Sequence, residues 1–282
     1  MSREAWSIEG ADGQPILGDT HLPEAPPRGV LVICHGFKGY KDYGFSPHLA
    51  DVAARRGLIA HRFNFSHSGM TNNVETFERP DLFEQDTWGK QMTDLDRVAA
   101  AVRDGVLPGD AVGLTMTWFG HSRGGVTVLL TASRGGTNRP DRIVAAAAPH
   151  SACFLDDEQR RTLRAQGYLE SPSSRTGQSL RLGKAWLDEI EADPDRLDPV
   201  RAIGSLSCSV LLIHGEADVS VPIDCAHVLS RAAPSATQLT VIAGATHTFN
   251  APNPMPPDRP PPQTTQMVEA VADFALTPLR QR

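Results

Sequence analysis

The six residues GHSRGG, at 120–125, stand between two apolar runs. AVGLTMTWF (111–119) has the composition of a strand, and VTVLLTAS (126–133) that of a helix. A strand that turns at once into a helix forces its turn residue into strained backbone angles, and small flanking residues let neighbouring backbone approach. The hydroxyl group of Ser122 is then left at the C-terminal edge of a sheet, beside a helix N-terminus that favours negative charge. We therefore expect Ser122 to be a nucleophile.

A nucleophilic serine needs a base, and the sequence offers His247 for this role. His247 lies in AGATHTF, just beyond the apolar run TQLTVIAG (237–244), which places it at the same edge of the sheet. His214 ends the run SVLLIHG (209–215), and there we expect a packed residue instead.

The base in turn needs an acid that orients it, and Asp218 is the favoured candidate. It follows the strand-like run SVLLIHG by a few residues. Glu216 and Asp224 compete with it. Glu216 stands very close to the strand end, whereas Asp224 stands where a helix begins, and capping would explain it.

An oxyanion hole requires two backbone donors near the serine. We expect the N–H groups of Arg123, which follows the nucleophile, and of Phe37 in HGFKG (35–39). His35 is expected to be structural. For the side chain of Arg123 we expect only an ion pair on the surface or with the insertion described below.

Strand-like and helix-like runs alternate along almost the whole chain. This alternation predicts an α/β fold with a mainly parallel sheet, helices on both of its faces and an antiparallel pair at its N-terminal edge. The expected strands are 5–22 (two strands around a turn), 29–36, 58–65, 111–119, 142–149, 209–215 and 237–244. The expected helices are 46–56, 86–105, the run after Ser122, 224–233 and 266–276.

The alternation is interrupted between residues 151 and 203, which predicts a small helical cap. In RLGKAWLDEIEAD (181–193), Leu182, Trp186 and Ile190 recur every four residues, which is typical of an amphipathic helix. The proline-rich segment 251–262 is expected to be an extended surface loop.

Composition excludes several classes of function. The net charge of −6 offers no basic surface for nucleic acid or an anionic membrane. The N-terminus lacks the apolar core of a secretory signal, and no apolar run is long enough to span a bilayer. The four cysteines form no C-x-x-C pair, which favours reduced thiols and a cytoplasmic location. The ten histidines show no metal-ligand spacing, so we expect neither a metal nor an organic cofactor.

Taken together, HGF, GHSRGG, HGEADVSVP and GATHTF make the chain resemble the α/β-hydrolase superfamily over nearly its whole length. The resemblance implies a core of residues 1–150 and 204–282 and a cap of residues 151–203, as in short-lidded bacterial carboxylesterases such as cinnamoyl and feruloyl esterases. One segment departs from the pattern: NFSHSGM, with Asn64 and Ser66, stands where many relatives have an aspartate and a G-H-G-type turn.

These features predict a serine hydrolase that cleaves a small-molecule carboxylic ester through an acyl-enzyme intermediate. Phe37, Trp186 and Phe249 are expected to line an apolar substrate pocket. A thioesterase, an amidase or peptidase, and a cofactor-free perhydrolase remain open on the same site, as does a non-catalytic relative that binds a ligand. The acyl group, the leaving group and the oligomeric state are not read from the sequence.

Overall fold

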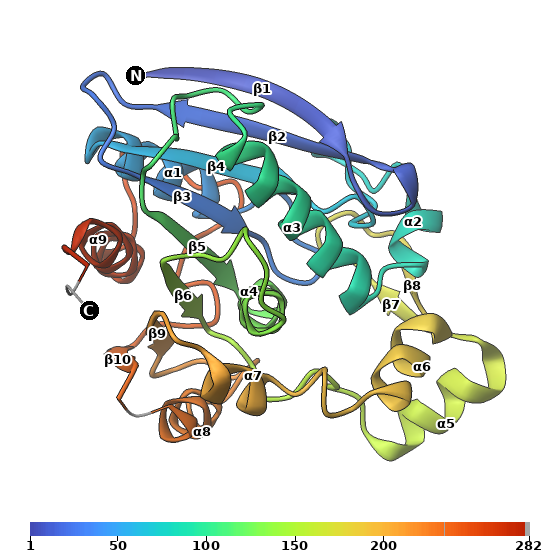
Figure 1. Ribbon diagram of the computed structural model, residues 1–282. Coiled ribbons are helices and arrows are strands. Elements are labelled where there is room, and N and C mark those ends of the chain that lie inside the picture. Colours follow the sequence, from blue (N-terminus) through green and yellow to red (C-terminus); the bar gives the residue numbers. More distant parts are fainter. Residues whose placement is uncertain (234, 280–282) are drawn as a thin grey trace.

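A single twisted sheet of eight strands forms the centre of the computed structural model, which describes residues 1–233 and 235–279 (Figure 1). Its strand order is β1-β2-β4-β3-β5-β6-β9-β10. β2 runs antiparallel to both β1 and β4, and the remaining neighbours are parallel. The strands are β1 (Ser2–Glu9), β2 (Pro15–Leu22), β3 (Gly29–Cys34), β4 (Leu58–Asn64), β5 (Met116–His121), β6 (Arg142–Ala146), β9 (Ser209–Gly215) and β10 (Thr237–Ile242). The predicted mainly parallel sheet with an antiparallel edge is confirmed.

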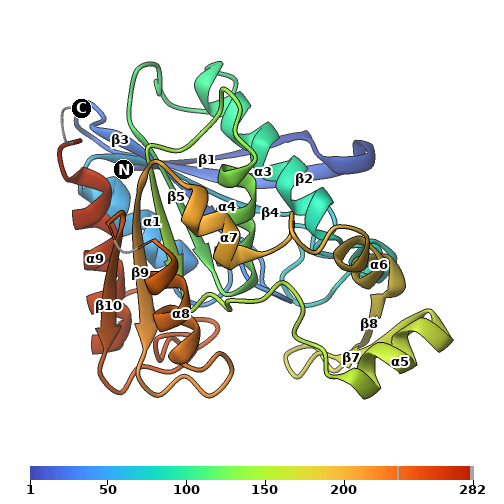
Figure 2. The same cartoon turned by 60° about the horizontal axis from the view of Figure 1, so that its bottom comes forward.

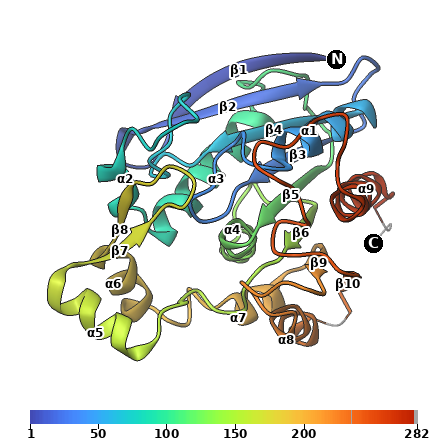
Figure 3. The same ribbon diagram turned by 180° about the vertical axis from the view of Figure 1, so that it is seen from behind.

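Helices cover both faces of this sheet because its central strands are apolar on both faces. In β3, Val30 and Val32 pack into the core under α3 and α4, whereas Leu31 and Ile33 pack into the core under α1 and α9. Figures 1 and 3 show these two helix layers from opposite sides. The helices of the core are α1 (Ser46–Arg55), α2 (Pro80–Glu84), α3 (Trp88–Arg103), α4 (Arg123–Ser133), α8 (Asp224–Ala232) and α9 (Pro262–Leu276).

Two expected boundaries differ from the structure by more than three residues. The strand expected at 111–119 begins only at Met116 and continues to His121, so it leads directly into Ser122. Helix α9 begins at Pro262, the last residue of the proline-rich segment, because a proline fits the first position of a helix. None of the described helices is both apolar enough and long enough to cross a membrane.

The interruption in the alternation contains α5 (Asp157–Gln166), the antiparallel strands β7 (Tyr168–Pro172) and β8 (Ser179–Gly183), and α6 (Lys184–Ala192). Figure 2 shows these elements together at one side of the sheet, far from α9. The next helix, α7 (Pro199–Ser205), packs against α4 of the core. The expected boundary at residue 203 falls inside α7, and the division into core and cap stays a prediction.

The prediction of an amphipathic helix at 181–193 is wrong for its first turn. Leu182 belongs to strand β8, and α6 starts only at Lys184. The reason lies at Gly183, whose backbone is extended and packs so closely on α2 that an added Cβ would lie 2.1 Å from the carbonyl oxygen of Glu84. Leu182, Trp186 and Ile190 are all buried, but on two different elements.

Candidate active site

Ser122 stands at the sharp turn between β5 and α4. Its φ of 54° and ψ of −118° are strained for a residue other than glycine. An added Cβ on Gly120 would lie 2.1 Å from the carbonyl oxygen of Gly124, and one on Gly124 would lie 2.5 Å from that of His35. Both positions therefore require glycine, as the expected turn demands.

His247 lies in the loop after β10 and contacts Ser122 directly. Its Nε2 atom lies 3.0 Å from Ser122 Oγ, and its Nδ1 atom lies 2.8 Å from Oδ2 of Asp218. His121, at the end of β5, anchors the loop that carries His247, since its Nε2 atom lies 2.8 Å from the carbonyl oxygen of His247. The three residues singled out in the sequence thus form one hydrogen-bonded chain.

Asp218 lies in the loop after β9, and its side chain is fully buried. Burial would raise the pKa of this carboxyl, but hydrogen bonds from His214, His247 and the N–H of Val221 hold the pKa well below its usual range. The N–H groups of Ser220 and Val221 both donate to Oδ1 at 2.9 Å. Asp218 is therefore an ionised acceptor for the imidazole.

The competing acids lie elsewhere. Glu216 Oε2 accepts a hydrogen bond from the N–H of Gly244 at 3.1 Å, and Asp224 is the first residue of α8. In the part of the chain that the structure describes, neither carboxylate forms a hydrogen bond with His247.

Arg123 and Phe37, whose N–H groups were expected to form an oxyanion hole, line the same cavity as Ser122. Arg123 is the first residue of α4, so its N–H has no carbonyl partner within the helix. Phe37 follows Gly36, where an added Cβ would lie 3.1 Å from Ser122 Cβ. The loop after β3 is therefore in close contact with the serine.

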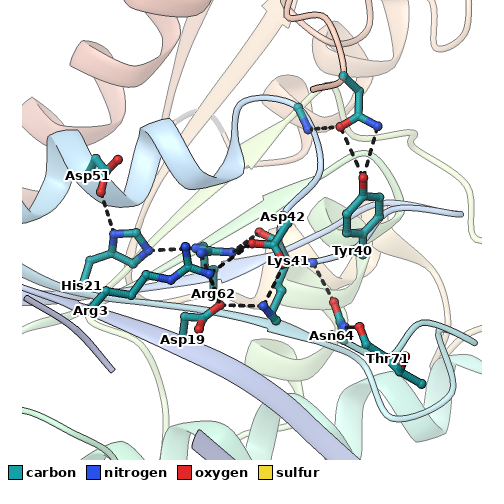
Figure 4. A network of polar contacts seen from close by, with 12 residues as sticks. Arg3, Asp19, His21, Tyr40, Lys41, Asp42, Asp51, Arg62, Asn64 and Thr71 are labelled. Atoms are coloured by element: carbon teal, nitrogen blue, oxygen red, sulfur yellow. Dashed lines mark hydrogen bonds and ion pairs between the residues drawn. The ribbon is translucent and has the colours of Figure 1, made fainter. Parts of the chain in front are cut away.

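A buried network of charges, which the sequence analysis missed, anchors the loop after β3 to strands β2 and β4 (Figure 4). Lys41 Nζ donates to Asp19 at 2.6 Å and to Asp42 at 2.7 Å. Arg62 of β4 is fully buried, and its Nη1 atom donates to Asp42 at 2.5 Å and to the carbonyl oxygen of Lys41 at 2.8 Å. Asn64 accepts from the N–H of Lys41 at 2.7 Å, which gives the departure at NFSHSGM a role in positioning the loop. The sequence signals of this network were charged residues within apolar runs: Arg62 in LIAHRFNF and Asp19 in PILGDTHL.

The expectation of a surface or cap ion pair for Arg123 is wrong. Its guanidinium is buried, with Nη2 3.1 Å from Oδ2 of Asp86, a core residue just before α3. The guanidinium carbon lies 4.9 Å from the ring centroid of Trp88 and 5.5 Å from that of Phe37. The two aromatic rings and the carboxylate of Asp86 stabilise the buried cation.

Two cavities open at Ser122 and His247. The first, which we call the aromatic cavity, has a volume of about 460 Å³. Its walls include Phe37, Trp88, Phe154, Pro149 and Pro222. The second, which we call the cationic cavity, has a volume of about 230 Å³. Its walls include Gly36, Phe37, Lys38, Tyr43, Ser173 and Arg175.

Of the three expected pocket residues, only Phe37 lines these cavities. Phe249 is fully buried in the core, packed against Phe45 and His121, because it turns away from the cavities behind His247. Trp186 is also fully buried, and its ring packs against Phe154 at 5.0 Å between centroids. Phe154, which the sequence analysis did not single out, lies between Trp186 and the aromatic cavity and lines its wall.

Among residues 1–233 and 235–279, no cluster of three or more histidine, cysteine, aspartate or glutamate residues is arranged to hold a metal ion. None of the four cysteines, all of which the structure describes, forms a disulfide.

Comparison with solved structures shows what this fold is similar to. A hydrolase from Agrobacterium vitis aligns with a TM-score of 0.72 at 20% identity, over 98% of this chain and all of that one. Est1E from Butyrivibrio proteoclasticus with bound ferulic acid aligns with a TM-score of 0.71 at 19% identity, over 96% of this chain and 98% of that one. A lidless serine hydrolase from Xanthomonas campestris aligns with a TM-score of 0.60 at 17% identity, over all of this chain and 98% of that one.

No protein-family model and no curated protein matches the sequence. The likeness therefore lies in the structure, which aligns with these neighbours over nearly the whole chain. The chain has the α/β-hydrolase fold, as its sequence motifs led us to expect.

Proposed function

We propose that the protein is a serine hydrolase that cleaves carboxylic esters. One observation carries the proposal: the imidazole of His247 bridges Ser122 Oγ at 3.0 Å and the buried carboxylate of Asp218 at 2.8 Å. This is the arrangement that converts a serine hydroxyl into a nucleophile.

In the first half of the reaction, Ser122 Oγ attacks the ester carbonyl carbon while His247 Nε2 takes the hydroxyl proton. The N–H groups of Phe37 and Arg123 donate to the oxyanion of the tetrahedral intermediate. His247 then gives its proton to the leaving oxygen, the alcohol departs, and the acyl group stays on Ser122. Asp218 holds the imidazole tautomer and stabilises its cation.

In the second half, His247 removes a proton from water as the water attacks the acyl carbonyl. Collapse of the second intermediate returns the proton to Ser122 and releases the acid. These groups and one water molecule account for every proton transfer in the proposed reaction.

The neighbours and the cavities support an ester as the substrate. Est1E has been solved with ferulic acid, and an esterase domain from Rhodothermus marinus aligns at 18% identity with a TM-score of 0.65. The aromatic cavity, with rings from Phe37, Trp88 and Phe154, suits an aryl or acyl chain.

The test is a hydrolysis screen that compares the unmodified protein with Ser122→Ala. We expect hydrolysis of p-nitrophenyl and aryl esters, and a loss of kcat of roughly four to six orders of magnitude in the variant. Ser133→Ala, at the far end of α4, is the matched control and should retain activity.

The same screen separates the alternatives. Acyl-CoA thioesters, amides and peptides test the thioesterase, amidase and peptidase readings, and added peroxide tests the perhydrolase reading. Full activity in Ser122→Ala would contradict the serine mechanism, and a folded protein without activity on any of these substrates would favour a ligand-binding relative. The cytoplasmic location and the absence of nucleic-acid and membrane partners stay predictions.

A further inference from the structure

The cationic cavity has walls from two distant parts of the chain. The loop after β3 contributes Lys38 beside Phe37, and the turn between β7 and β8 contributes Arg175. Ser122 and His247 line the same cavity. Any group bound there therefore lies next to the reacting atoms.

Lys38 holds its place at this cavity at a cost in backbone strain. Its φ of 58° lies in the left-handed region, which side-chain-bearing residues rarely adopt. Its ammonium group donates to the carbonyl oxygen of Pro172 at 2.8 Å and lies 5.4 Å from the ring centroid of Phe37. Both partners are neutral, and burial lowers the pKa of the lysine.

Arg175 also has only neutral partners. Its guanidinium carbon lies 4.7 Å from the ring centroid of Tyr40 and 5.2 Å from that of Phe77. The guanidinium donates to the carbonyl oxygen of Val74 and to Met70 Sδ. Within residues 1–233 and 235–279, neither Lys38 nor Arg175 forms an ion pair with a carboxylate.

The other buried cations of the site are compensated. Arg123 pairs with Asp86 beside the aromatic cavity. Arg62 on β4 and Lys41 in the loop after β3 pair with Asp19 and Asp42 (Figure 4). Because buried charges in proteins are normally paired, two partly buried cations with neutral partners, beside a nucleophile, point to an anion supplied by the ligand.

We propose that the cationic cavity binds a carboxylate carried by the substrate, so that the preferred esters bear a negative charge on one side of the scissile carbonyl. The proposal rests on the proposed esterase function and specifies its substrate class. A carboxylate suits the site better than a phosphate dianion, because a small, partly buried cavity penalises the desolvation of a dianion more strongly.

The experiment uses two matched pairs of esters with the full-length protein. 4-Nitrophenyl hydrogen glutarate and 4-nitrophenyl methyl glutarate differ only in a carboxylate on the acyl side. 4-Acetoxybenzoate and its methyl ester differ only in a carboxylate on the alcohol side. We expect kcat/KM to favour the charged member by about tenfold or more in at least one pair, and the preference to decrease as salt is added.

Lys38→Gln and Arg175→Gln should each reduce this preference severalfold. Arg181→Gln is the matched control: Arg181 is on strand β8 of the same hairpin, but it is exposed and stacks on Tyr168. It should leave the ratio of the two rates unchanged. The ratio is the readout because damage to folding or to Ser122 lowers both rates together.

The outcomes separate the two proposals. If neither neutral nor charged esters are hydrolysed, the proposed function fails. If neutral esters are hydrolysed and neither pair favours the carboxylate, the carboxylate site is overturned while the esterase stands. A preference that persists unchanged in both glutamine variants would also overturn it, since the charge would then be recognised elsewhere.

Discussion

The loops at the C-terminal edge of the sheet and the insertion of residues 151–203 border the same two cavities but are held in different ways. At the sheet edge, backbone hydrogen bonds and close glycine contacts hold Ser122 and Asp218. In the insertion, Phe154 is 55% exposed and is placed by ring contacts with Phe37 and Trp186. The difference indicates that the sheet edge holds the catalytic residues rigidly in place. The insertion supplies cavity walls, which substitutions can change with little loss of stability.

The largest effect after loss of the nucleophile is expected at the sheet edge. Asp218→Asn should lower kcat by roughly three to four orders of magnitude, because the amide no longer holds the imidazole in the required tautomer. Glu216→Gln, two residues earlier and hydrogen-bonded to the Gly244 N–H, is the matched control. Comparable losses in both variants, measured on a p-nitrophenyl ester, would show that the acid is misassigned.

The second prediction concerns acid stability, which depends on buried histidines outside the insertion. Burial lowers the pKa of four histidines: to about 4 in His35 and His67, and to about 3 in His61 and His121. In the unfolded chain a histidine has a pKa of about 6.5, so below this pH the unfolded state binds more protons than the folded state. The free energy of unfolding therefore decreases as the pH is lowered, by about 1 kcal/mol per pH unit for each histidine. Residues 151–203 contain no histidine.

Denaturant unfolding between pH 7 and pH 5 measures this slope. Burial also raises the pKa of Asp94 to about 6, so the folded state takes up a proton in the same pH range. This uptake offsets part of the decrease in the free energy of unfolding. His61→Gln should make the slope shallower. A free energy of unfolding that stays constant over this range would contradict the burial of these imidazoles.

The smallest effect is expected in the insertion. Phe154→Ala removes a ring from the aromatic cavity, and we expect kcat/KM for bulky aryl esters to fall about tenfold relative to acetate esters. Val106→Ala, an exposed apolar residue after α3, is the control for a general loss of surface area. Equal losses on all esters would mean that Phe154 serves packing, and would weaken the contrast between the two regions.

Sequence patterns predicted the sheet and the chain of Ser122, Asp218 and His247 because each depends on local features. A strand followed by Gly-x-Ser-x-Gly, or an acid a few residues beyond a strand, keeps its meaning wherever the rest of the chain lies.

The remaining features depend on contacts that no local pattern carries. Asp86 meets Arg123, and Arg175 meets Tyr40, only after the chain has folded. Leu182 fitted a helical pattern in the sequence, but it lies on strand β8. This strand continues to Gly183, which packs closely against α2, and the helix begins only after it. Phe249 is next but one to His247, yet the turn of its backbone sends the ring into the core.

The most direct test of the central claim is the site of covalent modification by a fluorophosphonate, located by peptide mass spectrometry. We predict one adduct, on Ser122 Oγ, formed rapidly in the unmodified protein and far more slowly in His247→Ala. An adduct on another residue, or ester hydrolysis that persists without an adduct on Ser122, would contradict the account.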